Sequence, residues 1–259
     1  MIQDIDAVSL VQRYTLGMRY ALDDRVFRYA KAGSTLDTDV GALNSLFQAV
    51  GYSRVDAALK GAKTVVITLD GHAAPNGDGQ LGDNVIAEDE LAGGYMLVYT
   101  HEFYHPPYSW TINRKILKNT ATDGAHLVMT VTIDRPLPVA LTGANTMHAE
   151  CIPSPYGKVV SGKPPAWPLM ARMSVVGFPT LSAQVDEYLW LQTWGPVYAA
   201  CGPGDHFGDS DVNRNLVFNS YGAVDYPAAY PNGQHAGHVL SNFRLGTPGT
   251  AIFFLEITP

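Results

Sequence analysis

The sequence contains little charge. Acidic and basic residues make up only 16% of its 259 residues, against roughly 25% in an ordinary soluble domain. The net charge is −7, and no run of Lys and Arg exceeds two residues. Because proteins bind the nucleic-acid backbone through basic stripes, this composition argues against nucleic acid as a partner. A surface with so few charged residues is typical of a protein whose surface is covered by neighbouring subunits.

Cysteines, a basic leader and long apolar runs are scarce or missing. Two cysteines, Cys151 and Cys201, are too few for a disulfide framework or a four-cysteine zinc site. The residues Met1–Asp6 are acidic where a secretory signal is basic, so we expect synthesis in a reducing cytoplasm. The longest apolar runs, such as Ile252–Leu255, are far shorter than the roughly 20 residues of a bilayer span. The sequence therefore predicts no membrane partner.

Strand patterns dominate what is present. Hydrophobic residues make up 46% of the chain, and many of its 25 Gly and 17 Pro stand in turn-like clusters. Within Tyr14–Tyr29, two alternating runs meet at Asp23-Asp24, which predicts a β-hairpin. Further segments rich in β-branched and aromatic residues predict strands at 64–69, 95–100, 109–117, 127–133, 173–176, 188–192, 216–218 and 252–257.

One region instead favours a helix. Asp39 is a capping residue and Gly51 is a stop residue. Between them, apolar residues recur at helical spacing: Leu43, Leu46, Phe47 and Val50. A second short helix is predicted over Val55–Leu59.

The predicted fold class is therefore mainly β, with a β-sandwich or jelly-roll-like body, an N-terminal hairpin and one or two short helices. The predicted boundary lies near Gly61. Residues 1–60 hold an N-terminal arm (Met1–Gln12), the hairpin and the short helix, and residues 61–259 form the β-rich body. The long irregular stretches between strands are typical of functional loops or partner contacts.

The sharpest chemical motif is His101-Glu102-Phe103-Tyr104-His105, which fits the zinc-hydrolase pattern H-E-x-x-H. That chemistry needs a helix through both histidines. A strand pattern precedes the motif, and Pro106-Pro107 follows it, which disfavours a helix at His105. In a strand the two histidines lie roughly 13 Å apart, too far for one zinc ion. The pattern therefore indicates an aromatic, proline-rich strand end.

Other metal-like patterns are weaker. Asp70, Asn76, Asp78 and Asp83 lie among glycines, and Asp209, Asp211 and Asn213 match the start of a calcium loop whose later ligand positions are missing. These residues are also ordinary turn formers. His235 and His238 suit a metal only on a helix, whereas their surroundings favour a strand; His148 and Glu150 are among the remaining scattered groups. We predict no catalytic, cofactor-binding or metal-binding residues and no enzymatic activity.

Two aromatic segments carry a resemblance. They are Arg25–Gly33, and Val175–Pro179 leading into Tyr188–Pro196. Together with the close of the chain, from Gly237–Leu240 through Gly249 to Leu255, they resemble virion structural proteins of tailed bacteriophages, in the group assigned as capsid decoration or cement proteins. The shared motifs are structural, and they cover about a quarter of the chain directly.

This resemblance implies a protein on the outer surface of the capsid, made in the host cytoplasm. Its expected partners are the major capsid protein and further copies of itself, assembled as a trimer and bound across the seams of the expanded shell. We expect four aromatic residues to anchor the hairpin, to the subunit's own core or to the shell: Tyr14, Tyr20, Phe27 and Tyr29. The arm at residues 1–12 is either a strand donated to a neighbour or a frayed end.

Three alternatives stay open. A head fibre, tail or adaptor component differs from cement in copy number. A zinc hydrolase requires His101, Glu102 and His105. A carbohydrate-binding β module requires an aromatic stacking platform, for which the candidates are Trp110, Trp167 and Trp194.

Overall fold

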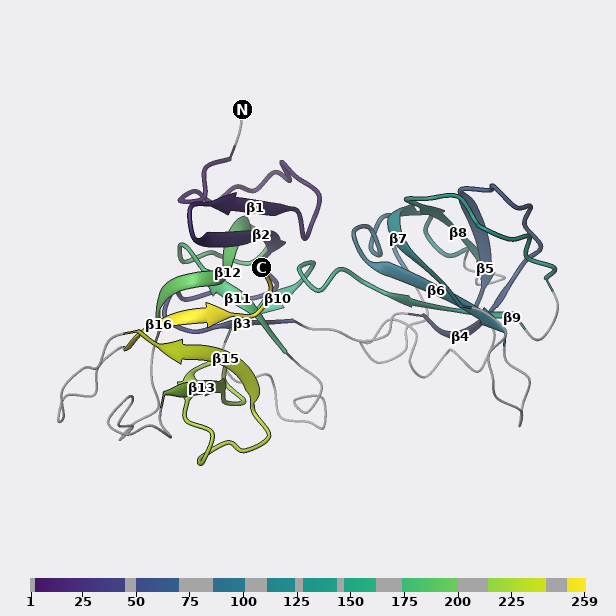
Figure 1. Ribbon diagram of the computed structural model, residues 1–259. Coiled ribbons are helices and arrows are strands. Elements are labelled where there is room, and N and C mark those ends of the chain that lie inside the picture. The colour runs from purple at the N-terminus through teal and green to yellow at the C-terminus, as the bar shows by residue number, and fades with distance from the viewer. Residues whose placement is uncertain are drawn as a thin grey trace. The chain divides into compact units, whose positions relative to one another are not determined.

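The computed structural model describes residues 3–44, 50–69, 86–100, 111–123, 128–143, 147–161, 174–199, 214–240 and 251–259. Throughout these residues the regular elements are β-strands, which confirms the mainly-β prediction (Figure 1). Two compact units divide the chain: Met1–Ser45 with Pro155–Pro259, called here the sheet unit, and Leu46–Ser154, called the barrel unit. This division differs from the boundary predicted near Gly61, because the chain leaves the sheet unit and later returns to it.

The sheet unit is one ten-stranded sheet with antiparallel pairing throughout its named strands. Its order is β10-β3-β11-β12-β16-β15-β13-β14, with β2 paired to β12 and β1 paired to β2. The strands are β1 (Arg19–Leu22), β2 (Arg25–Lys31), β3 (Ala42–Asn44), β10 (Val159–Val160), β11 (Val175–Pro179), β12 (Tyr188–Ala199), β13 (Asn215–Phe218), β14 (Val224–Asp225), β15 (Gln234–Val239) and β16 (Ala251–Glu256).

The predicted N-terminal hairpin is confirmed. β1 and β2 pair from Arg19–Arg28 to Leu22–Arg25 around the Asp23-Asp24 turn, where Asp23 has φ 52°. The long strand β12 holds this hairpin to the rest of the sheet, because its first half pairs with β2 and its second half with β16. The two pairings overlap at Trp194, and the next residue, Gly195, has a φ of 95°. A Cβ there would lie 2.6 Å from the Asp24 carbonyl oxygen, so the close approach requires glycine.

The predicted helices are wrong wherever the structure describes them. Leu43, expected on a helix, lies in β3 and pairs with β10 on one side and β11 on the other. Val50 begins β4, and residues 45–49 lie outside the described residues. Pairing on both edges buries Leu43 and satisfies its backbone, so tertiary contacts override the local helical spacing.

The second predicted helix is also replaced by extended chain. Val55 ends β4 with its side chain fully buried. Ala58 forms an isolated bridge with Leu141, with N–O distances of 3.0 and 2.8 Å in the two directions. The two hydrogen bonds of this bridge give the Ala58 backbone the partners that a helical turn would otherwise supply.

The barrel unit closes in the order β4-β5-β8-β7-β6-β9. Its strands are β4 (Val50–Val55), β5 (Thr64–Thr68), β6 (Tyr95–Thr100), β7 (Thr111–Asn119), β8 (Val128–Ile133) and β9 (Met147–Ile152). Alternate side chains point inward and form one core of Val, Ile, Leu, Met, Ala and Cys residues. Where a β-sandwich or jelly-roll-like body was predicted, the described strands form a curled ten-stranded sheet and a closed, filled barrel. No described helix has the length and apolarity of a membrane-crossing segment.

Candidate functional site

The predicted N-terminal arm is docked on its own sheet unit from Gln3 onward. Gln3 donates two hydrogen bonds of 2.8 Å, to the carbonyls of Ala7 and Tyr188, and accepts one of 2.7 Å from the Tyr29 hydroxyl. Ser9 then forms a backbone bridge with Tyr188. Backbone and buried side-chain hydrogen bonds therefore hold the segment in place within one chain.

The aromatic anchors predicted on the hairpin pack mainly inside this unit. Tyr29 and Phe27 are buried, and Tyr14 meets Tyr29 edge-on at 5.2 Å between ring centroids. Trp190 lies 5.1 Å from Tyr29 and completes the cluster. Burial raises the pKa of Tyr29 above its usual value, because the charged phenolate would be poorly solvated. Of the four predicted anchors, only Tyr20 is exposed, by 43%.

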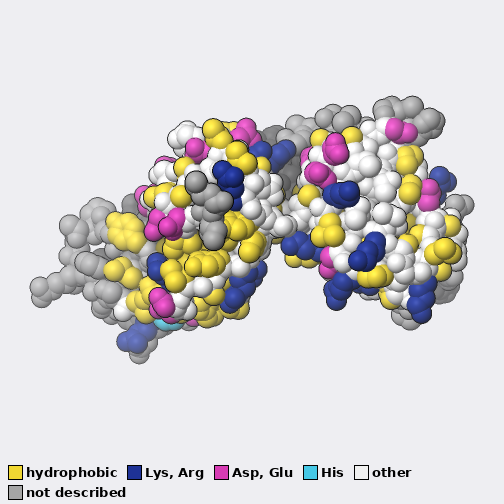
Figure 2. All heavy atoms as spheres, turned by 90° about the horizontal axis from the view of Figure 1, so that it is seen from above, with side chains coloured by type: hydrophobic (Ala, Val, Ile, Leu, Met, Phe, Trp, Pro, Cys, Tyr) yellow, Lys and Arg dark blue, Asp and Glu magenta, His cyan; other side chains and the backbone are white. Residues whose placement is uncertain are grey.

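Exposed apolar side chains lie along the docked arm. Val8, Leu10 and Val11 flank the Ser9 bridge and are 37%, 74% and 55% exposed. The neighbouring turn before Tyr188 adds exposed Leu181 and Val185. Figure 2 shows hydrophobic side chains gathered on this side of the sheet unit, with few basic groups among them. The arm therefore carries apolar surface to solvent while its backbone is tied down.

A second exposed surface lies on β12, β16 and β15, and is called here the outer face. Strand register and a backbone hydrogen bond set eight of its side chains in three rows: Tyr198, Ile252 and Leu240; Pro196, Phe254 and His238; Trp194 and Glu256. His235 joins the third row through its side-chain contact with Glu256. The alternate residues of the same strands, including Phe253 and Leu255, point into the core. Apolar and aromatic residues thus occupy the solvent side of an antiparallel sheet, where polar residues are usual.

A β-bulge creates the ionisable end of the outer face. Along a regular strand, His235 and His238 would point to opposite sides, because side chains alternate. β15 instead bulges where its pairing with β13 passes from Val217 to Leu216. At this point β15 has one residue more than β13, next to Gly237. A Cβ on Gly237, at φ 142°, would collide with the Phe254 carbonyl oxygen. The bulge therefore needs glycine, and it brings both imidazoles to the same carboxylate.

Glu256 lies between the two histidines. Its Oε2 is 2.9 Å from His235 Nε2, and its Oε1 is 3.0 Å from His238 Nδ1. The hydrogen bond with His235 contributes most to holding the pKa of Glu256 below its usual value. The strand prediction for this segment is confirmed. The three-group contact was not predicted; Gly237 between the histidines is the one local sign of a bulge in this strand.

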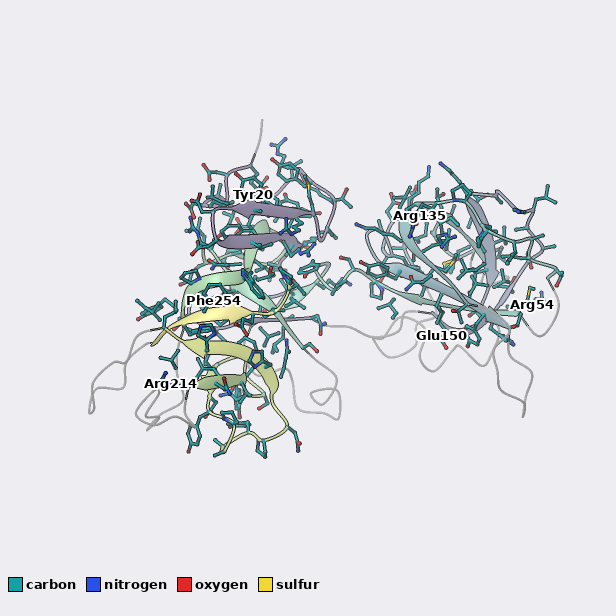
Figure 3. The ribbon with its side chains drawn as sticks, in the orientation of Figure 1. Tyr20, Arg54, Arg135, Glu150, Arg214 and Phe254 are labelled. Carbon is teal, nitrogen blue, oxygen red and sulfur yellow. The ribbon has the colours of Figure 1, made fainter. Side chains whose placement is uncertain are left out.

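Aromatic contacts join the ionisable end of the outer face to its apolar part. His238 stacks on Phe254 with centroids 5.4 Å apart and planes at 14°, and Trp194 meets Phe254 edge-on at 5.5 Å. Phe254 is labelled on β16 in Figure 3. Trp194 is half-buried against this ring. The packing within the chain fixes the orientations of these rings, so an association through this face would cost less entropy.

The zinc-hydrolase residues His101, Glu102 and His105 lie outside the described residues, as do Trp110 and Trp167. The two calcium-like loops, at 70–83 and 209–213, lie outside them as well. Within the part of the chain that the structure describes, no group of three or more His, Cys, Asp or Glu residues is placed to hold a metal ion.

Three other polar candidates sit on the barrel unit's β9. Glu150, labelled in Figure 3, accepts a 3.0 Å hydrogen bond from the Tyr99 hydroxyl. His148 packs 6.1 Å from the Tyr99 ring. Cys151 is fully buried, and this burial raises the pKa of its thiol, which suits a core residue and not a nucleophile.

No protein-family model, curated protein or solved structure matches the chain.

Proposed function

We propose that the chain is a non-enzymatic virion protein that decorates and stabilises a bacteriophage capsid. The observation that carries this proposal is the outer face, where aromatic and aliphatic side chains stand exposed on a well-packed sheet. Tyr198, Ile252 and Leu240 are 52%, 40% and 48% exposed. Contiguous exposed apolar surface of this kind marks protein–protein contact sites, and aromatic residues are enriched in such interfaces.

The proposed mechanism is multivalent docking. The outer face contacts the major capsid protein, and the apolar arm surface around Leu10 contacts a neighbouring copy of the chain in a trimer. Each added contact then forms at high effective concentration, so the assembly binds more tightly than one subunit. Bridging several capsid subunits raises the work needed to separate them against internal DNA pressure.

Two measurements test the proposal. The chain is mixed with expanded capsids of its own phage that lack it, and bound copies are counted after sedimentation. We expect hundreds of copies per particle; about a dozen or fewer would indicate the head-fibre, tail or adaptor alternative. Native mass spectrometry reports the assembly state, and we expect a metal-free trimer of the 28.0 kDa chain.

A protein that saturates no capsid at micromolar concentration would contradict the decoration function. A monomer carrying one zinc ion would favour the hydrolase alternative through His101 and His105.

A further inference from the structure

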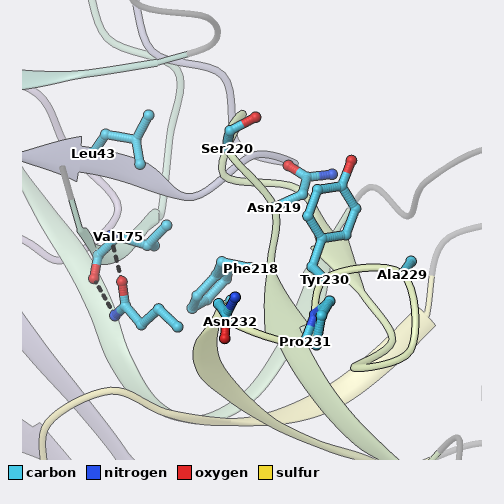
Figure 4. A pocket seen from close by; sticks show the side chains of 11 residues that line it. Leu43, Val175, Phe218, Asn219, Ser220, Ala229, Tyr230, Pro231 and Asn232 are labelled. Atoms are coloured by element: carbon cyan, nitrogen blue, oxygen red, sulfur yellow. Dashed lines mark hydrogen bonds between the residues drawn. The ribbon is translucent and has the colours of Figure 1, made fainter. Parts of the chain in front are cut away.

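A pocket of about 370 Å³ opens beside β13 and the loop before β15 in the sheet unit (Figure 4). Its floor is apolar and consists of buried Leu43, Val175 and Phe218. These three residues belong to the core cluster under the sheet, which the inward-pointing Phe253 and Leu255 also join. The pocket therefore lies on the core side of these strands, away from the outer face.

Hydrogen bonds within the chain build this pocket in advance. The side-chain amide of Gln234 accepts from the Val175 N–H at 2.8 Å and donates to the Val175 carbonyl at 2.9 Å, as Figure 4 shows. This amide stands in for a strand neighbour and spaces β11 from β15. The Asn219 Oδ1 accepts from the backbone N–H groups of Tyr221 and Ala223, at 2.9 and 3.2 Å, and fixes the turn on the other side.

The loop that forms the rim is also tied down by its own backbone. The Tyr226 carbonyl accepts hydrogen bonds from Ala229 and Tyr230 at 3.1 and 3.3 Å, and Gly233 donates to the Tyr230 carbonyl at 2.9 Å. Gly233 passes so close to the Phe218 carbonyl oxygen that a Cβ would lie 2.8 Å from it. The rim is thus shaped without a ligand.

The rim presents neutral polar groups whose hydrogen-bonding capacity is unused. Within the described residues, the Asn219 amide NH₂, the Tyr230 hydroxyl and the Asn232 side-chain amide have no protein partner, and the same holds for the Ser220 hydroxyl. Among the described residues that line the pocket there is no Asp, Glu, Lys, Arg or His.

This combination selects the chemistry of the ligand. A charged ligand would lose hydration with no opposite charge to compensate it. A fully apolar ligand would displace water from the amides and hydroxyls at the rim without replacing its hydrogen bonds. A neutral, polyhydroxylated ring satisfies both parts, since its C–H groups pack on the apolar floor and the Tyr230 ring while its hydroxyls pair with Asn219 and Asn232. The volume lies at the lower end of ligand pockets, which suits one or two sugar units.

We propose that this pocket is a binding site for a neutral carbohydrate. The site goes beyond capsid docking, because it uses different residues on the core side of the sheet. It also differs from a surface stacking platform of tryptophans, since its recognition groups are amides and hydroxyls around an apolar floor.

The test uses the full chain and saturation-transfer NMR titrations with D-glucose, D-galactose and N-acetyl-D-glucosamine, with D-glucuronate as the charged comparison. We expect at least one neutral sugar to bind with a millimolar dissociation constant, and glucuronate to bind at least about tenfold more weakly because its charge stays uncompensated. Asn232→Ala and Tyr230→Phe should each weaken binding at least about fivefold, because each removes a hydrogen-bonding group.

The matched control is Tyr221→Phe. Tyr221 is exposed on the neighbouring turn but does not line the pocket, so the variant should bind like the parent chain. Asn232 and Tyr230 are exposed rim residues, and their variants should keep the parent unfolding temperature. Three results would overturn the proposal: no neutral sugar bound at high millimolar concentration, binding unchanged in both rim variants, or glucuronate bound more tightly than every neutral sugar.

Discussion

The two units differ in how their sheets are closed and in what fills their cores. The barrel unit closes its sheet, and the cluster of buried apolar residues described inside it is aliphatic, with Tyr99 buried apart from that cluster. The sheet unit stays open, with β1, β10 and β14 at its ends, and fills its cores with aromatic clusters such as Tyr29, Phe27 and Trp190. Closure removes unpaired edges, whereas an open sheet leaves edges and faces available to other chains. This difference is why we propose the capsid contacts on the sheet unit.

The largest expected effect comes from removing the aromatic centre of the sheet unit. Trp190 is 2% exposed and contacts both Tyr29 and Tyr14. Trp190→Ala should lower the free energy of unfolding of this unit by about 3–5 kcal/mol. Hydrogen exchange with peptide-level resolution in mild denaturant reports each unit separately. Protection should fall in β2, β12 and the N-terminal segment, while equal loss in β5–β8 would show that the units do not unfold separately.

The reverse experiment targets the barrel unit. Ile67 is fully buried in β5, inside the aliphatic core. Ile67→Ala should cost about 2–5 kcal/mol, because the closed barrel cannot collapse around the cavity. The same exchange measurement should now show loss in the barrel strands, and preserved protection in β12 and β16. If the sheet strands lose protection too, the comparison between independent units fails.

A smaller effect tests the bulge that shapes the outer face. Gly237→Ala should destabilise the sheet unit by about 1–3 kcal/mol, because the new Cβ meets the Phe254 carbonyl in a strained conformation. Gly61→Ala, in the barrel unit, is the comparison for its own unit, since Gly61 also has a positive φ, of 89°, but faces open space. Thermal unfolding compares the two. An equal cost for both variants would mean that the close approach at β16 contributes nothing.

The smallest expected effect concerns pH. The pKa of Glu256 is lowered in the folded chain, chiefly through the hydrogen bond with His235. A lowered folded pKa means that the unfolded chain takes up the proton first as pH falls. The stabilisation from Glu256 is therefore full above the unfolded value of about 4.3 and is lost as pH falls through the lower folded value. Because the pair is largely solvated, the loss should stay below about 1 kcal/mol.

Glu256→Gln isolates this contribution. The free energy of unfolding of the sheet unit, measured in urea, should fall less steeply from pH 6 to pH 3 for the variant than for the parent chain. The pH profile of Asp186→Asn is the comparison on the same unit, because Asp186 is an exposed carboxylate whose pKa is lowered by Lys31 in a separate ion pair. A parent and a Glu256→Gln variant with identical pH profiles would show that the His235–Glu256–His238 contact carries no stability.

Much of the strand content followed from the sequence because it depends on local alternation. The Tyr14–Tyr29 hairpin and the strands near 64–69, 95–100, 127–133 and 252–257 appear close to where alternation and turn residues place them. The helix predicted at Leu43 was wrong, because its short strand is defined by pairing with two strands distant in sequence and not by the local spacing of apolar residues. Strand order and barrel closure are likewise set by pairing between distant segments.

The candidate surfaces were less predictable than the strands. His235 and His238 lie in a segment that was predicted to be a strand, and regular alternation would place them on opposite faces. The register shift against β13 instead places both beside Glu256. The arm residues Gln3 and Ser9 are polar and give no local indication of docking, which depends on Tyr188 far along the chain. Side-chain meetings across strands require a register that a single sequence does not encode locally.

The most direct test of the central claim compares one exposed apolar residue from each unit. Ile252 is 40% exposed on the outer face, and Leu117 is 51% exposed on the barrel unit. Ile252→Asp and Leu117→Asp are each titrated onto expanded capsids that lack the chain, with bound copies measured by sedimentation. We expect Ile252→Asp to weaken capsid binding at least about tenfold, through a buried unpaired charge, and Leu117→Asp to bind like the parent. Unchanged binding by Ile252→Asp, with both variants folded, would contradict docking through the outer face.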